Sequence, residues 1–284
     1  MTDAQSVQSS LRKWLISGRH GDGGWGYYPG KAVRLEPTCW ALLALRDLDP
    51  GVLTSWPTTG GLLRERAAGE TNLAFHALAM LTLASRGREH REGSASLLRS
   101  LEGAKGLALG PSTINRQDNA LQGWSWMAGT FSWVEPTAWA LLALRKHEGL
   151  GQRVEAARMS AAEALLVDRC CETGGWNYGN SNMLGKELRP YVPTTAIALL
   201  ALQKRPIPVV TKSVAYLERA AASESSAMAV SLATLALRAH GRPADALRPL
   251  LFQAARTIEL GQHLGAAMAL YALQAETAGD AFAL

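Results

Sequence analysis

Apolar residues gather in six stretches rich in Ala and Leu, and each stretch is apolar around nearly its whole circumference. A helix that is apolar on every side is typical of a helix buried on every side. The six stretches lie at 36–47, 71–86, 135–147, 193–204, 225–240 and 261–277. We therefore predict six fully buried helices.

A second set of candidate helices precedes these, and it has a different character. In 151–169, apolar residues from Val154 to Leu165 share one face, while Arg153 and Glu163 lie elsewhere, as in an amphipathic helix with one wet side. Alternating runs of strand length are absent, and Gly and Pro fall between the helices. The second set lies at 3–17, 60–67, 91–102, 151–169, 207–221 and 243–258.

Alternation of the two kinds predicts an all-α protein with one domain over residues 1–284. The specific prediction is an (α/α)6 barrel of six helix hairpins, with an apolar inner ring and an amphipathic outer ring. An open superhelix of helix pairs is the alternative. We favour the barrel because a solenoid does not require one helix of each pair to be apolar all round.

A Gly-Trp pair, a variable loop and a Pro-Thr pair stand before three of the apolar stretches. Twelve residues separate Trp25 from Pro37 and Trp124 from Pro136, whereas seventeen separate Trp176 from Pro193. The third loop is thus expected to be five residues longer. Glycine permits the positive φ of a sharp turn, and tryptophan offers a large packing surface. We interpret Gly-Trp as the joint between repeats, with ligand contact as the alternative.

These Gly-Trp turns, followed by (E/V)PTxxALLAL helices, resemble the repeats of squalene–hopene and oxidosqualene cyclases and of protein prenyltransferase β-subunits. The resemblance is strong at 20–48, 120–147 and 172–204 and weaker elsewhere. It implies an α/α toroid whose central cavity holds an isoprenoid-like ligand.

The chain also departs from these families. It has the length of one barrel, whereas triterpene cyclases have two. Their Asp-x-Asp-Asp-Thr motif falls on residues 133–137, where Glu135 is the one acid, and Asp-rich magnesium motifs are absent. Asp168-Arg169-Cys170 matches the Asp-x-Cys of the prenyltransferase zinc site but precedes a Gly-Gly-Trp turn, and no histidine follows at a fitting place. We expect no metal and no cofactor.

Glu36 and Glu135 are the candidate catalytic residues, because each stands directly before Pro-Thr at the start of a predicted inner helix. A carboxylate there could simply offset the positive helix end, which would lower its pKa. An acid that protonates an alkene or epoxide instead needs a pKa raised by burial.

Aromatic and basic residues near the same helix starts are the candidate substrate-binding groups. Aromatic rings could stabilise carbocations through their π faces, although core packing is an equally good explanation. Two basic pairs with i, i+3 spacing could hold a diphosphate or carboxylate, or could be solvated loop charges. The candidates are Trp40, Trp139, Trp126, Trp133 and Phe131, with Lys31, Arg34, Lys186 and Arg189.

Composition narrows the class of partner. The net charge is +5 with scattered cations, which argues against nucleic acid and allows an anionic ligand. The N-terminal sequence lacks the apolar core of a secretory signal, and the three cysteines have no zinc-type spacing. We expect a cytoplasmic protein with an apolar small-molecule substrate, for which peripheral membrane contact is allowed. The sequence does not reveal the oligomeric state.

Two functions remain open. One is an enzyme that acts on an isoprenoid or similar long apolar substrate, by acid-initiated cyclisation or prenyl transfer. The other is a non-catalytic lipid-binding or protein-interaction module that has lost the catalytic motifs. An (α/α)6 glycosidase is weak, because carboxylates near the inner helices are few. The long segment 103–122 is predicted to cover one mouth of the barrel.

Overall fold

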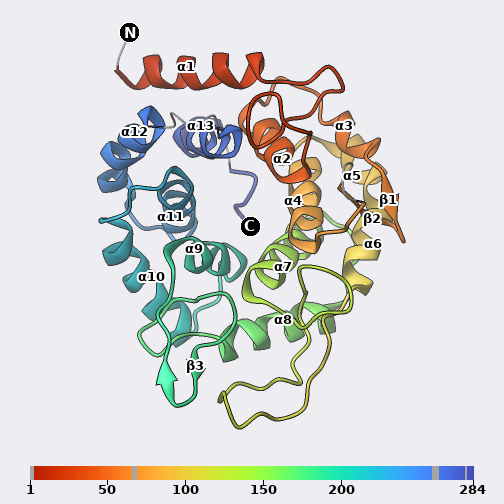
Figure 1. Ribbon diagram of the computed structural model, residues 1–284, viewed down its shortest axis with the longest axis vertical. Coiled ribbons are helices and arrows are strands. Elements are labelled where there is room, and N and C mark those ends of the chain that lie inside the picture. Colours follow the sequence, from red (N-terminus) through yellow and green to blue (C-terminus); the bar gives the residue numbers. More distant parts are fainter. Residues whose placement is uncertain (1–2, 66–68, 258–261, 279) are drawn as a thin grey trace.

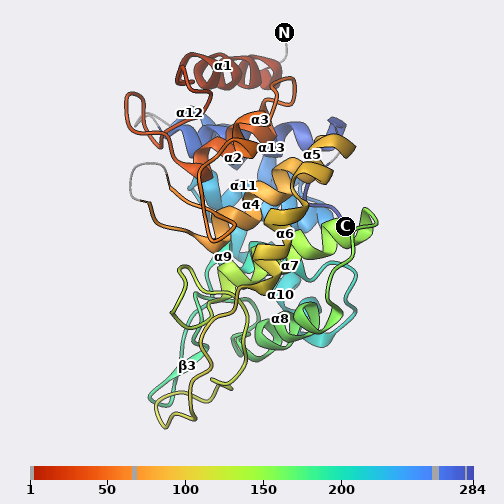
Figure 2. The same cartoon turned by 90° about the vertical axis from the view of Figure 1, so that its right-hand side faces the viewer.

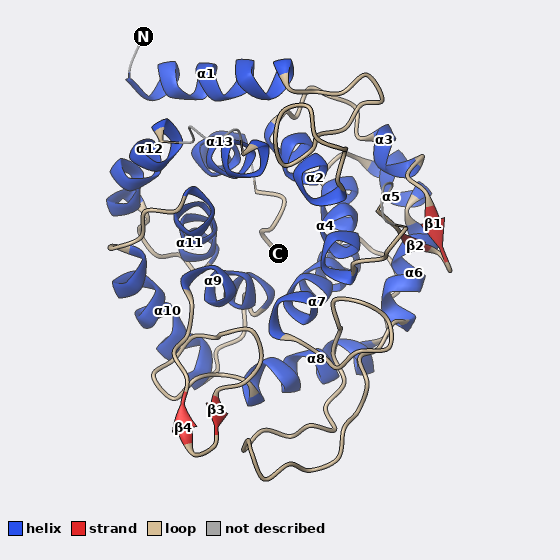
Figure 3. Cartoon of the chain, in the orientation of Figure 1, coloured by secondary structure: helices blue, strands red, loops and turns tan. Residues whose placement is uncertain are grey.

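The computed structural model describes residues 3–65, 69–257, 262–278 and 280–284 and is all-α apart from two very short hairpins (Figure 1, Figure 3). Six of its helices correspond to the six apolar stretches. Nine of the ten residues of the first and eleven of the twelve of the second are buried. The six are α2 (Leu35–Ala44), α4 (Leu73–Ala84), α7 (Val134–Gly149), α9 (Val192–Ala201), α11 (Ala227–Ala239) and α13 (His263–Ala278).

These six helices follow one another around a common centre (Figure 1). Each helix contacts the next one in the series: α2 packs against α4, α4 against α7, α7 against α9, α9 against α11 and α11 against α13. Helix α13 packs in turn against α2. The prediction of six buried helices is confirmed: each one meets two neighbours in the series, and α4, α7, α9, α11 and α13 also pack against helices of an outer layer.

The outer layer is made of amphipathic helices. In α10, five of fourteen residues are buried, and they recur at helical spacing on one face. Each outer helix packs against one or two of the six, for example α10 against α9 and α11. The outer helices are α1 (Asp3–Ser17), α6 (Ala95–Gly103), α8 (Ala156–Asp168), α10 (Pro208–Ala221) and α12 (Arg248–Arg256), with the short α3 (Gly51–Thr54), α5 (Arg88–Gly93) and η1 (Asp245–Leu247) between them.

The helix predicted at 60–67 is wrong. Thr58–Thr59 (β1) and Leu62–Leu63 (β2) form an antiparallel hairpin, in which Thr59 lies opposite Leu62. Gly60 and Gly61 both have positive φ, 59° and 79°, which suits a tight turn and not a helix. Residues 66–68 lie outside the described part. A second hairpin pairs Asn182–Met183 (β3) with Lys186–Glu187 (β4).

The Gly-Trp joint has the same hydrogen bonds in all three copies. The indole N–H of Trp25 donates to the carbonyl of Leu15 in the preceding outer helix (2.7 Å), and its backbone N–H donates to Oγ1 of Thr38 (3.0 Å). All three tryptophans are completely buried. The equivalent bonds join Trp124 to Leu101 and Thr137, and Trp176 to Leu166 and Thr195.

The third copy has a different register from the one expected. The threonine that binds Trp176 is Thr195, and not Thr194 of the Pro-Thr pair. The tryptophan-to-threonine separation is 19 residues there and 13 in the other two copies, so the loop is six residues longer instead of five. Pro193 consequently takes the position that a glutamate holds in α2 and α7, which is why α9 brings no carboxylate to its first turn.

A further contact links each Gly-Trp loop to the previous helix in the series. The carbonyl two residues after the tryptophan accepts a hydrogen bond from the first backbone N–H of that helix. Trp126 accepts from Leu73 of α4 (3.0 Å), and Tyr178 accepts from Val134 of α7 (3.0 Å). Tyr27 accepts from His263 of α13 (2.9 Å). The contact between the last helix and the first is therefore of the same kind as those within the series.

Candidate carboxylate site and its surroundings

Glu36 and Glu135 lie in the first turns of α2 and α7, at equivalent positions. In each helix the first backbone N–H has a partner other than this glutamate. The backbone N–H of Leu35 donates to the carboxylate of Glu65 (3.2 Å to Oε2), and that of Val134 donates to Tyr178. Both glutamates also keep some accessible surface, unlike the fully buried residues that follow them. Neither carboxyl is thus the cap of the first N–H of its helix.

The surroundings of Glu36 favour its neutral form. The pKa of Glu36 is raised to about 7, mainly by burial and to a smaller extent by the negative charge of Glu65, against the opposing effects of Tyr27 and Arg34. The hydroxyl of Tyr27 donates to Oε2 of Glu36 at 2.6 Å. Burial and the same carboxylate also raise the pKa of Tyr27 well above its ordinary value, so this hydroxyl stays a hydrogen-bond donor.

Glu135 has a similar environment and is coupled to Glu36. Burial is the largest cause that raises the pKa of Glu135 to about 7, and the charge of Glu36 is the second. A hydrogen bond with Trp139 acts in the opposite direction. Two buried carboxyls that interact in this way do not ionise independently. At a given pH the pair therefore holds more protons than two ordinary surface glutamates would.

The predicted ring residues Trp40 and Trp139 belong to an aromatic cluster one helical turn below the two glutamates. Their rings meet edge to face with centroids 6.2 Å apart. Tyr271 of α13 and Phe282 of the C-terminal segment complete the cluster, and Phe282 packs at 5.2 to 5.5 Å from the other three rings. All four residues are at most 4% exposed. The structure thus places Phe282 against the rings expected to line a cavity.

The other predicted aromatic residues lie apart from this cluster. Trp126 pairs with Phe75 of α4, with ring centroids 6.4 Å apart. Phe131 stacks at 4.9 Å on Trp133 in the loop before α7, and Phe131 is 44% exposed. Phe131 and Trp133 line a separate cavity of about 260 Å³ with the long loop before them.

The two basic pairs are not brought together. Lys31 and Arg34 line a cavity of about 690 Å³ between the loop before α2 and the starts of α11 and α13. Arg34 is ion-paired to Glu65 (3.2 Å). Lys186 and Arg189 are exposed at and after strand β4, on another loop. A shared diphosphate site for all four residues does not follow from this arrangement, whereas Lys31 and Arg34 do border one cavity.

Tyr27 links the cavity that contains Lys31 and Arg34 to Glu36 of the carboxylate pair. Tyr27 lines the cavity, and its hydroxyl bonds to Glu36. The remaining wall is largely apolar, with Met228 and Leu264 from the two helix starts. No sequence pattern distinguishes Tyr27 from the adjacent Tyr28. Glu65 carried no signal either, because it reaches Leu35 from a segment expected to be helical.

Segment 103–122 does not cover this cavity. The backbone N–H of Leu184 in the second hairpin donates to the carbonyl of Ile114 (2.7 Å), and Arg116 is ion-paired to Glu187. The segment runs alongside that hairpin and extends away from the helices (Figure 2). The predicted lid is thus attached at a different loop.

Three arginines that no sequence expectation covered bind backbone carbonyls of α9 and α13 and at the end of α2. Arg86 donates to carbonyls at the end of α2, Arg145 to Ala201 at the end of α9, and Arg238 to Ala272 in α13. Cations at helix C-termini are favourable to the helix dipole. The Leu-Ala-Leu-Arg sequences at 142–145 and 235–238 were the available signal.

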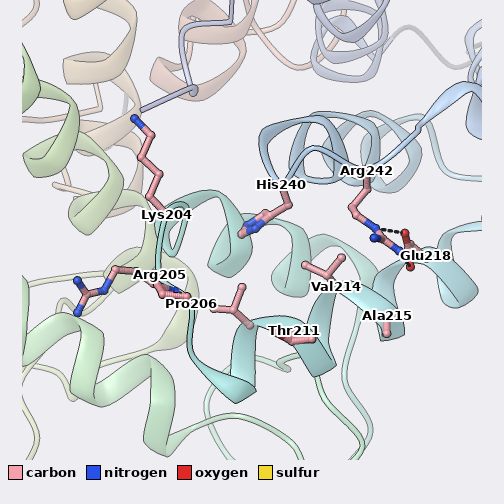
Figure 4. A pocket seen from close by; sticks show the side chains of 10 residues that line it. Lys204, Arg205, Pro206, Thr211, Val214, Ala215, Glu218, His240 and Arg242 are labelled. Carbon is pink, nitrogen blue, oxygen red and sulfur yellow. Dashed lines mark hydrogen bonds and ion pairs between the residues drawn. The ribbon is translucent and has the colours of Figure 1, made fainter.

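A cavity of about 540 Å³ lies between α9, α10 and α11 (Figure 4). Its floor is apolar, with Val210 and Val214, and its rim includes Lys204 and His240. Arg242 is ion-paired to Glu218 across it (2.6 Å), as Figure 4 shows.

No group of three or more potential metal ligands is found among the described residues. Arg169 pairs with Asp168, and burial raises the pKa of the Cys170 thiol, so Asp168-Arg169-Cys170 is not arranged to bind zinc. Within the described part of the chain, no helix is both long enough and apolar enough to cross a bilayer.

Comparisons with known proteins support the fold alone. No family model matches the chain, and no curated protein matches it. A crystal structure of a protein from Actinoplanes is similar in structure, with a TM-score of 0.59 over 96% of this chain and 99% of that chain. The two sequences are 17% identical.

Proposed function

We propose that this chain is an (α/α)6 barrel of the squalene cyclase and prenyltransferase repeat type. The cyclic order of contacts among the six buried helices supports this proposal, as does the recurrence of one hydrogen bond at the contact of α13 with α2. The three Gly-Trp joints, with identical hydrogen bonds, give it further support.

Within this barrel, we propose an enzyme in which the Glu36–Glu135 pair acts as a general acid on an isoprenoid or another long apolar substrate. The supporting observation is the pair of carboxyls at equivalent helix starts, each with its pKa raised to about 7. An effective general acid has a pKa near the working pH. The carboxyl O–H would give its proton to an alkene carbon, and the carboxylate would remain beside the cation.

The cavity that contains Lys31 and Arg34 is the proposed entrance for the substrate. Its apolar wall and two cations suit a chain with an anionic head group. Two residues of its lining with apolar surface, Tyr28 and Met228, are exposed. Such residues are compatible with contact with a membrane surface from which an apolar substrate could be taken.

The alternative is a non-catalytic binding module. It is supported by Phe282, which is completely buried and packs against Trp40, Trp139 and Tyr271 at the centre. A substrate reaching the glutamates would need space that this ring now occupies.

Incubation with farnesyl diphosphate and with squalene, followed by mass spectrometry of bound and released compounds, tests the proposal. We expect a cyclised or transferred product that Glu36→Gln and Glu135→Gln each reduce by about 100-fold or more, as for loss of a general acid. The matched control is Glu89→Gln, an exposed carboxylate on α5. Retention of ligand without turnover would favour the binding module, and full activity in both glutamine variants would reject the acid role.

A further inference from the structure

The C-terminal segment 280–284 lies at the centre of the six helices (Figure 1). Lys146 near the end of α7 and Gln203 just after α9 donate to it, so it lies at the ends of these helices, opposite the helix starts that carry the glutamates. Phe282 of this segment completes the aromatic cluster. Because Trp40 and Trp139 each follow a glutamate by four residues, the Phe282 ring reaches to within one helical turn of both carboxyls.

Polar contacts hold the backbone of this segment. Asp280 accepts from the hydroxyl of Tyr271 and from the N–H of Phe282, both at 2.8 Å. The amide of Gln203 donates to the carbonyl of Phe282 (2.8 Å) and accepts from the N–H of Leu284 (3.2 Å). The apolar ring of Phe282 at the centre is thus followed, toward the outside, by backbone carbonyls that accept hydrogen bonds.

Cations outnumber carboxylates around these acceptors, because the adjoining cavity is lined by Arg145, Lys146, Lys204 and Arg205 and by Glu148 and Glu163. The ammonium group of Lys146 donates to the carbonyl of Ala283. Lys146 and Lys204 line a cavity of about 620 Å³ together with Ala283 and Leu284. Figure 4 shows Lys204 extending toward the C-terminal end of the chain. The order outward from the centre is therefore aromatic rings, one amide and two lysines.

We propose that this end of the barrel is a binding site for an anionic amphiphile with a long apolar chain, such as a fatty carboxylate, and that segment 280–284 is its displaceable internal occupant. The apolar chain replaces Phe282 among Trp40, Trp139 and Tyr271. The carboxylate replaces the carbonyl oxygens that now accept from Gln203 and Lys146. The inference does not depend on catalysis by the glutamates, since it concerns the other mouth.

The segment competes with such a ligand, because both need the same space. The apparent affinity is reduced by the fraction of molecules in which the site is open. Removing the contacts of the segment therefore strengthens binding without adding any contact to the ligand.

Calorimetry with lauric acid tests the proposal, with 1-dodecanol and dodecyltrimethylammonium as probes of equal chain length. We expect Phe282→Ala and Asp280→Ala each to bind lauric acid about tenfold or more tighter than the unmodified chain. Asp280→Ala leaves the aromatic cluster complete, so it remains informative if the first variant is unstable. Equal affinity of the unmodified chain and of both folded variants overturns the proposal.

The charge of the head group and the movement of the segment are tested separately. Lys146 contacts both the segment and the proposed head group, so its test is the preference for lauric acid over 1-dodecanol, from which the effect on the segment cancels. We expect Lys146→Gln to reduce this preference about tenfold, as for loss of a charge-assisted hydrogen bond, whereas exposed Lys105→Gln leaves it unchanged. Hydrogen exchange of the amides of Ala281, Phe282 and Leu284 is expected to accelerate when lauric acid is bound. Equal binding of the three probes, or unchanged exchange at saturating lauric acid, contradicts the proposal.

Discussion

Glu36 and Glu135 show how the surroundings of a residue can reverse a local effect. At a helix start, the dipole lowers the pKa of a carboxyl. Here other groups satisfy the first N–H of each helix, and burial raises both pKa values to about 7. The position of the two residues was readable from the sequence, whereas the direction of the pKa change was decided by what surrounds them.

This reversal predicts a pH-dependent stability. The folded-state pKa of Glu36 is above the value in the unfolded chain, so its contribution is fully present below about pH 4.5 and is lost as the pH rises through about 7. Unfolding by urea between pH 5 and 8 measures this. We expect Glu36→Gln to gain about 2–3 kcal/mol relative to the unmodified chain over that range. A difference independent of pH, like that expected for Glu89→Gln, would contradict the raised pKa.

At the scale of single elements, the Gly-Trp loop is a fixed unit that joins three helices. Trp124 binds the outer helix before it and the threonine of the inner helix after it, and Trp126 of the same loop binds the start of the preceding inner helix. A buried N–H without a partner costs free energy, so these bonds make the repeat specific and not merely apolar. The repeated Gly-Trp and Pro-Thr pairs predicted the joint. The hydrogen-bond partner of each N–H could be identified only from the packed helices.

The corrected register of the third repeat is directly testable. Thr195→Val removes the oxygen that accepts from the buried N–H of Trp176, and we expect a loss of about 1–3 kcal/mol in the free energy of unfolding. Thr194→Val is the matched control one residue away and is expected to cost less. Chemical denaturation of both variants measures the difference. A larger loss for Thr194→Val would restore the register inferred from Pro-Thr.

At the scale of the whole molecule, the two ends of the chain are packed against each other. Helix α13 contacts α2 and α1, and the ring of His263 lies 4.6 Å from that of Trp14. Nδ1 of His263 also bonds to the carbonyl of Gly26 (2.8 Å). Contacts between residues far apart in sequence couple the first and last helices into one unit.

Because the first and last helices are in contact, we expect substitution of His263 to change the stability of both. We expect His263→Ala to lower the free energy of unfolding by about 1–3 kcal/mol. Hydrogen exchange should accelerate in α1 and in the loop that leads to α2 as well as in α13, because the lost contacts join α13 to Trp14 and to Gly26. Mass spectrometry of peptic fragments measures this. Faster exchange confined to α13 would indicate an open arrangement of helix pairs.

The sequence alone determined the helical class, the six buried helices and the joints between repeats, because hydrophobic periodicity and turn residues act over short distances along the chain. It also singled out Glu36 and Glu135 by their repeated position. Only the tertiary structure decided the hairpin at β1–β2, the role of Thr195, the coupling of the two carboxyls and the place of Phe282 at the centre. Each of these depends on residues that are distant in sequence and meet only after the helices have packed.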